Sequence, residues 1–170
     1  MPPDEPFQIQ VADTPALLDA ARVIVREYAD GLGVDLCFQN IEAELATLPG
    51  EYAEPGGVLL LALVGDEVAG CGALRAITDV DYPDACEMKR LYVRPSHRGL
   101  GIGLALARAL VDQATQVGYS VMLLDTLDEM EAARSMYEAM GFEEIPPYYF
   151  NPIAGAHYLK LDLRSAATRF

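Results

Sequence analysis

The sequence is short of positive charge and of cysteine, and each shortage excludes a class of protein. Lys and Arg total 12 against 26 Asp and Glu, which gives a formal net charge of −14. General nucleic-acid binding is therefore not expected, because affinity for phosphates comes largely from Lys and Arg. The cysteines are an odd number without CxxC spacing: Cys37, Cys71 and Cys86. They predict neither a disulfide framework nor a structural zinc site, and reduced thiols of this kind are typical of the cytoplasm.

Long apolar segments are also missing. The longest uninterrupted apolar run, Val58–Val64, is far shorter than the ~18 residues that a membrane-spanning helix needs. The chain begins with an acidic, proline-rich stretch and lacks the basic end and apolar segment of a secretory signal. We therefore expect a cytoplasmic protein that does not bind a membrane.

The sequence does contain enough apolar material for a core. Hydrophobic residues make up 52% and charged residues 22% of the 170 residues, a balance typical of one folded domain. Residues 1–170 are therefore predicted to form a single domain. Runs of strand length alternate with stripes of helical periodicity, which indicates an α/β fold. The predicted strands are 7–11, 58–64, 68–77, 87–93, 119–126 and 156–163, and the predicted helices are 15–31, 41–48, about 102–117 and about 128–141.

Charge is distributed unevenly along the chain. Residues 27–74 contain nine acids and no Lys or Arg. Residues 88–111 contain no acid and five cations, namely Lys89, Arg90, Arg94, Arg98 and Arg108. A basic segment in an acidic protein favours a local anion site, although chance and pairing on a helix surface give the same pattern.

A glycine-rich stretch inside this basic segment predicts where the anion binds. Pro95 ends the preceding strand, and Gly99, Gly101 and Gly103 let the backbone pass close to a ligand before a helix begins. Unpaired N–H groups at a helix N-terminus favour a phosphate, and Arg98 adds a forked donor suited to a diphosphate. The spacing matches neither GxxxxGK[ST] nor GxGxxG. Glycines in such a turn are also common for structural reasons alone.

Two motifs resemble the GNAT superfamily of N-acetyltransferases. Arg98-x-x-Gly101-x-Gly103, which follows Leu91-Tyr92-Val93 and opens a helix, is similar to the coenzyme A pyrophosphate signature of that superfamily. Ala133-x-x-x-Tyr137-x-x-x-Gly141-Phe142 is similar to its next characteristic segment. Residues 87–93 and 147–152 also resemble a bacterial branch of these enzymes. The resemblance implies an α/β fold with a mixed, mostly antiparallel sheet of six to seven strands, about four flanking helices and a splay at the cofactor strand.

The resemblance also implies a cosubstrate, acetyl-CoA, and no metal. The pantetheine arm would pair with the backbone of Leu91, Tyr92 and Val93, and an N–H of this strand would polarise the thioester carbonyl. The pyrophosphate would bind a cradle made of Arg98, Gly99, Leu100, Gly101, Ile102 and Gly103. Met130 departs from the pattern, because many members have an asparagine there that contacts the cofactor.

An acid and a base are implied in the same way. Tyr137 matches a tyrosine that protonates the departing thiolate, although a tyrosine on a helical stripe is also typical of a core. Glu87 matches a position where many members place the base that deprotonates the amine; the alternative is a surface carboxylate paired with Lys89. We expect His97 to be a solvated loop residue more than a cofactor contact, and His157 to be structural.

These features predict an acetyl-CoA-dependent N-acetyltransferase in which a primary amine attacks directly in a ternary complex. The alternative is a non-catalytic module that binds acyl-CoA as a sensor or in an assembly; the presence of both Glu87 and Tyr137 favours the enzyme. The acceptor, a small molecule or peptide, is expected to be cationic, because acids between Asp30 and Glu54 and uncharged aromatic residues at 148–150 are expected to border its site. The oligomeric state is left open, a homodimer included.

Overall fold

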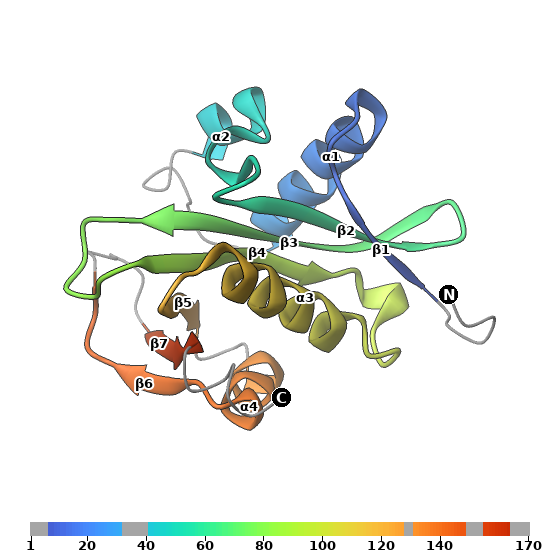
Figure 1. Ribbon diagram of the computed structural model, residues 1–170. Coiled ribbons are helices and arrows are strands. Elements are labelled where there is room, and N and C mark those ends of the chain that lie inside the picture. The colour runs from blue at the N-terminus through green and yellow to red at the C-terminus, as the bar shows by residue number, and fades with distance from the viewer. Residues whose placement is uncertain (1–6, 32–40, 128–130, 149–154, 164–170) are drawn as a thin grey trace.

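The computed structural model of the protein describes residues 7–31, 41–127, 131–148 and 155–163. Within these ranges a seven-stranded sheet carries four α-helices and two short 3-10 helices (Figure 1). The strands are β1 (Gln8–Val11), β2 (Val58–Val64), β3 (Glu67–Ile77), β4 (Ala85–Val93), β5 (Val121–Leu127), β6 (Glu143–Ile145) and β7 (Ala156–Asp162). The helices are α1 (Pro15–Gly31), α2 (Ile41–Thr47), η2 (Gly50–Tyr52), η3 (Pro95–His97), α3 (Ile102–Val117) and α4 (Glu131–Met140).

The sheet is mixed and mostly antiparallel, with the strand order β1-β2-β3-β4-β5-β7-β6. Its parallel pair is β4 and β5, whereas all the other neighbouring strands run antiparallel. A parallel pair needs a crossover connection, which α3 provides between the two strands. The tight turn at Gly65 joins β2 to β3, since Val64 pairs with Glu67.

Helices cover both faces of the sheet: α1 and α2 lie on one side and α3 and α4 on the other (Figure 1). A hydrophobic core lies on each face of the sheet. Each strand contributes side chains to both cores, because successive side chains of a strand point to opposite faces. Leu59 and Leu61 pack in the core under α1 and α2, whereas Leu60 packs with α3 and α4. The inward side of α3 is fully buried at Leu106 and Leu110. Among the helices of the described ranges, none is long and apolar enough to cross a membrane.

The predicted fold class is confirmed, with one additional strand and with differences of one or two residues at the ends of several others, β5 among them, which begins at Val121 and not at 119. Strand β4 begins at Ala85, two residues before the predicted start, because Ala85 pairs with β3 on one side and with β5 on the other. Strand β6 was not among the predicted segments. It is only three residues long and carries the exposed acids Glu143 and Glu144, so alternation gives little signal there.

Two buried cysteines make the stability of this fold sensitive to alkaline pH. Burial raises the pKa of Cys71 and of Cys86 from the ordinary value of 9.0 to about 12. The folded protein therefore keeps both protons where the unfolded chain loses them, and stability falls as the pH rises from about 9 toward 12. Each thiol is expected to raise the unfolding equilibrium constant by up to about tenfold per pH unit in this window.

Urea unfolding of the wild type and of a Cys71→Ala/Cys86→Ala variant, from about pH 8 to about pH 11, measures this dependence. The variant should lose less stability per pH unit above pH ~9, although it starts from a lower value because two buried side chains are shortened. Equal pH slopes in the two proteins would contradict the assignment.

Candidate active site

Strand β4 carries a bulge in the middle of the sheet. The register with β3 shifts between Lys89 and Tyr92, so that the two residues between them, Arg90 and Leu91, face a single residue of β3. Arg90 takes φ +59°, an uncommon left-handed conformation for a residue with a side chain. The bulge thus adds one residue to β4 and disturbs its pairing at this point.

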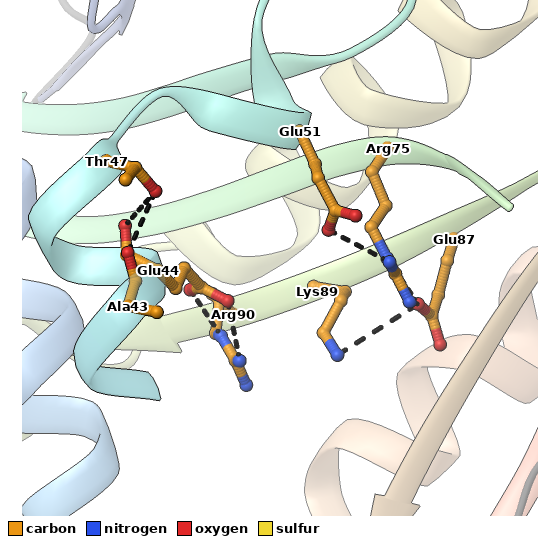
Figure 2. Close-up of polar contacts among 8 residues, drawn as sticks. All are labelled: Ala43, Glu44, Thr47, Glu51, Arg75, Glu87, Lys89 and Arg90. Carbon is orange, nitrogen blue, oxygen red and sulfur yellow. Dashed lines mark hydrogen bonds and ion pairs between the residues drawn. The ribbon is translucent and has the colours of Figure 1, made fainter. Parts of the chain in front are cut away.

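The bulge changes which side chains share a face of the sheet. Glu87 and Lys89 alternate onto the face covered by α1 and α2, and Figure 2 shows them there beside Arg90. The added residue brings Arg90 onto this same face, where it reaches Glu44 of α2. Leu91 then packs in the core under α3. Without the bulge, adjacent residues would point to opposite faces, so the bulge is what gathers Lys89 and Arg90.

Strands β4 and β5 are paired over only part of their length. Their register comprises three pairs, Ala85–Val121, Cys86–Met122 and Glu87–Leu123. Both strands continue beyond this point, β4 to Val93 and β5 to Leu127. Within the described residues, the second half of β4 therefore leaves its β5 side without a partner strand. An unpaired strand backbone of this kind can pair with an extended ligand.

The predicted phosphate cradle follows directly after β4. Gly99 and Gly101 have φ +87° and +82°, and open space lies where a Cβ would stand on either residue. Gly101 is the N-cap of α3 and has no side chain to cap the helix, so the first N–H groups of α3 receive no hydrogen bond from the cap residue. The Nε of Arg98 donates to the carbonyl of Val93 at 3.1 Å, which ties the cradle to the end of β4.

Other residues of the predicted cofactor set have different surroundings. The side chain of Ile102 is buried beneath α3, whereas Leu100 is 45% exposed. Tyr92 packs on the α1 side, where its hydroxyl donates to Glu27 at 2.9 Å and its ring lies 5.4 Å from that of Tyr28. Met130 lies outside the described residues.

On the face covered by α1 and α2, buried Arg90 and half-buried Glu44 form an ion pair (Figure 2). The Nε and Nη2 of Arg90 each donate to one oxygen of Glu44 at 2.9 Å, a bidentate arrangement that holds the bulge against α2. Burial by itself would raise the pKa of Glu44, but the hydrogen bonds and charge of Arg90 outweigh it and the pKa is lowered.

Glu87 lies at the centre of a second polar cluster and is only 1% exposed. Its Oε1 accepts from Arg75, with Nε at 2.9 Å and Nη2 at 2.7 Å, and Lys89 Nζ lies 4.0 Å away. Its Oε2 accepts from the hydroxyl of Tyr148 at 2.7 Å. The pairing with Lys89 is therefore present, but Glu87 is not the surface carboxylate of the alternative interpretation.

A pocket of about 370 Å³ lies between α2, η2 and β3. Arg75 lines it and links it to Glu87, while Glu44 lines it and links it to Arg90. Glu51, at its rim, accepts from Arg75 Nη1 at 2.9 Å. The remaining lining residues are Ala43, Thr47, Pro49, Gly50 and Tyr52. This pocket is thus in contact with both charged clusters of the sheet.

Tyr137 belongs to the opposite layer. It is 6% exposed on α4 and packs edge-on against Phe142, with ring centroids 5.5 Å apart. Burial raises its pKa, and the nearby Asp125 carboxylate raises it further. Glu87 and Tyr137 thus lie on different sides of the sheet.

The two histidines have protein partners. His97 Nε2 lies 3.4 Å from Glu67 and its Nδ1 lies 3.0 Å from Ser96 Oγ, so this side chain is half-buried and not simply solvated. His157 Nδ1 lies 3.3 Å from Glu144 on the neighbouring strand, a structural contact as expected.

Acids of the expected acceptor border are paired with arginines from other parts of the sequence. Glu42 pairs with Arg26, and Glu44 and Glu51 pair with Arg90 and Arg75. These pairs reduce the negative potential that the charge count suggested. Tyr149 and Phe150, the other part of that argument, lie outside the described residues, and the cationic acceptor stays a prediction.

Comparison with known proteins identifies the class. Residues 26–142 match the model of the Acetyltransferase (GNAT) family. This range holds the bulge, the glycine cradle and Tyr137. The chain belongs to this family, and it is an acetyltransferase.

Relatives named as N-acetyltransferases match most of the chain. An uncharacterised N-acetyltransferase of Schizosaccharomyces pombe is 39% identical over 157 residues, which cover 92% of this chain and 95% of the relative. The uncharacterised N-acetyltransferase YjgM of Escherichia coli is 30% identical over 138 residues, 81% of each chain.

Solved structures show the same fold. An acetyltransferase from Streptococcus agalactiae has a TM-score of 0.74 at 19% identity, with 93% of this chain and 99% of that chain covered. The Salmonella typhimurium protein yncA, solved with its cofactor acetyl-CoA, has a TM-score of 0.70 at 20% identity, with 93% and 94% covered.

The residues of this chain fit the acetyl-CoA that the family uses. The cradle offers helix N–H groups without a side-chain cap, open space over two glycines, and an arginine, which together suit a diphosphate. The part of β4 that has no partner on its β5 side ends at Val93, and the cradle follows it in the chain. The roles of the individual residues stay predictions.

Substitution in the cradle tests this assignment. Gly101→Val places a branched side chain over the N–H groups of α3, and we expect the affinity for coenzyme A to fall by at least about tenfold, measured by titration calorimetry. Gly118→Val is a matched control, because Gly118 also has a positive φ (+104°) and open space around it, but caps the other end of the same helix. Both variants carry similar backbone strain, so an equal loss of affinity in the two would contradict the cradle.

Proposed function

We propose that the protein transfers the acetyl group of acetyl-CoA to a primary amine by direct attack in a ternary complex. The observation that carries this proposal is the opening between β4 and β5, which has the glycine cradle at one end and the acceptor-side charges on one face. A cosubstrate lying along β4 would present its thioester beside these charges. The acceptor would then approach on this face, where the 370 Å³ pocket borders Arg75, a neighbour of Glu87.

The chemistry asks three things of the chain. A backbone N–H of Leu91, Tyr92 or Val93 would hold the carbonyl oxygen as negative charge develops on it, typically the largest catalytic contribution. An amine with a pKa of ~10.4 is mostly protonated near neutral pH, so a group on the acceptor side must take its proton. We assign this role to Glu87. Acetyl-CoA supplies the activated thioester.

The third role, protonation of the departing thiolate, falls to Tyr137. Burial raises its pKa above the ordinary 10.0, so the phenol keeps its proton at neutral pH. A thiol has a pKa of only ~8.5, which means that complete proton transfer from Tyr137 to the thiolate is uphill. Tyr137 therefore helps by hydrogen bonding and partial transfer, and its contribution is modest.

Tyr137→Phe should lower kcat by roughly tenfold, at the lower end of what a general acid contributes. The affinity for coenzyme A should stay within about twofold, because the ring still packs against Phe142. Release of the free thiol, followed with a thiol reagent across a panel of primary amines, measures both activity and acceptor. An unchanged kcat would remove Tyr137 from the mechanism.

Glu87→Gln should flatten the acidic limb of the pH profile of kcat/KM, because the amide cannot accept the amine proton. Glu42→Gln is the control for loss of a carboxylate, since Glu42 is 71% exposed and pairs with Arg26 on the surface. Its profile should match that of the wild type. If the pH profile of kcat/KM of Glu87→Gln equals that of the wild type, another group takes the proton.

A further inference from the structure

Glu87 cannot be reached directly by an acceptor in the described structure. Its side chain is 1% exposed, and both carboxylate oxygens accept hydrogen bonds from protein groups. A proton from the acceptor must therefore pass through one of its neighbours. The neighbours in contact with it are Arg75, Lys89 and Tyr148.

These neighbours differ in whether they can carry a proton. A guanidinium group is a donor only, so Arg75 offers no lone pair for an incoming proton. Burial lowers the pKa of Lys89, but its Nζ lies 4.0 Å from Glu87 Oε1, beyond hydrogen-bond distance, so Lys89 does not pass a proton directly to Glu87. A phenol is both donor and acceptor, and the hydroxyl of Tyr148 already donates to Glu87 Oε2 at 2.7 Å. Tyr148 is also half-buried, whereas Glu87 is fully buried. It is thus the neighbour that can face an acceptor on one side and Glu87 on the other.

The surroundings hold Tyr148 in this position. Its ring packs edge-on against Tyr158 of β7, with centroids 5.4 Å apart, and against a small core that includes Leu123. Arg75 binds the opposite oxygen of Glu87 through two donors, so the carboxylate is held from both sides. A hydrogen bond fixed in this way does not need to reorganise when the proton moves.

We infer that Tyr148 and Glu87 form a two-residue proton relay for the acceptor amine, an inference that rests on the proposed function. The acceptor ammonium gives one proton to Tyr148 Oη while the hydroxyl proton of Tyr148 moves to Glu87 Oε2, and the resulting neutral amine forms the new C–N bond. The C–S bond breaks, its electron pair leaves with sulfur, and the departing thiolate takes the second proton from the nitrogen to leave as the free thiol. After product release, Glu87 returns its proton through Tyr148 to the solvent. Tyr148 is therefore a further catalytic residue, and Glu87 acts through it.

A double-mutant cycle of Tyr148→Phe and Glu87→Gln tests the relay with acetyl-CoA and the best amine of the panel. Each single variant should lower kcat/KM for the amine by roughly 10- to 100-fold, because either one interrupts the path. The double variant should be no more than about threefold slower than the slower single variant. Losses that multiply in the double variant would overturn the relay, as would Tyr148→Phe within about twofold of the wild type.

A tether that only positions Glu87 is distinguished by the pH profile. The relay predicts that Tyr148→Phe and Glu87→Gln lose the same acidic limb, whereas a tether predicts that Tyr148→Phe keeps the limb with a higher KM. Tyr82→Phe is the matched control, because Tyr82 packs in the same small core and its ring lies under Lys160. It should keep wild-type rate and profile. If the wild type transfers the acetyl group to no amine, the proposed function and the relay are overturned together. If the wild type is active but Tyr148→Phe keeps the acidic limb of the pH profile of kcat/KM, the relay alone is overturned.

Discussion

The bulge at Arg90 is the constraint on which the rest of the site depends. One added residue in β4 brings two adjacent cations onto the face covered by α1 and α2 and sends Leu91 into the core under α3. It lies just beyond the last pair of β4 with β5, so the irregular part of the strand coincides with the opening between them. A left-handed arginine is unfavourable by itself, and the bidentate pair with Glu44 stabilises it.

Buried charges on the face covered by α1 and α2 are compensated pair by pair. Glu44 neutralises Arg90, and Arg75 is shared between buried Glu87 and exposed Glu51. Removal of one partner from such a pair leaves an uncompensated charge, which is far less favourable than either the intact pair or an apolar replacement. The arrangement therefore fixes where each carboxylate points. That precision is what a site needs if a proton is to move over a distance as short as the 2.7 Å between Tyr148 and Glu87.

Local patterns in the sequence were sufficient for most of the fold and for the glycine turn that precedes α3. Alternation, helical stripes and the glycine spacing of 99–103 act over a few residues, and the structure follows them closely. The contacts that were missed join residues far apart: Glu44 with Arg90 are 46 positions apart, and Glu87 with Tyr148 are 61. The bulge has no local signal either, because its left-handed residue is an arginine and not a glycine. For the same reason, the count of acids between Asp30 and Glu54 overestimated the negative charge of this segment. The arginines that pair with its acids come from other elements.

We propose that the opening beside β4 and the glycine cradle form one continuous site for coenzyme A. Titration of coenzyme A into the ¹⁵N-labelled protein, followed by the backbone amide resonances, tests this proposal. We expect the largest shifts on Leu91–Val93 and on Gly99–Gly103 together, with little change in β1 or β6. Shifts confined to another part of the sheet, or saturable binding that leaves the amides of Gly99–Gly103 unchanged, would contradict it.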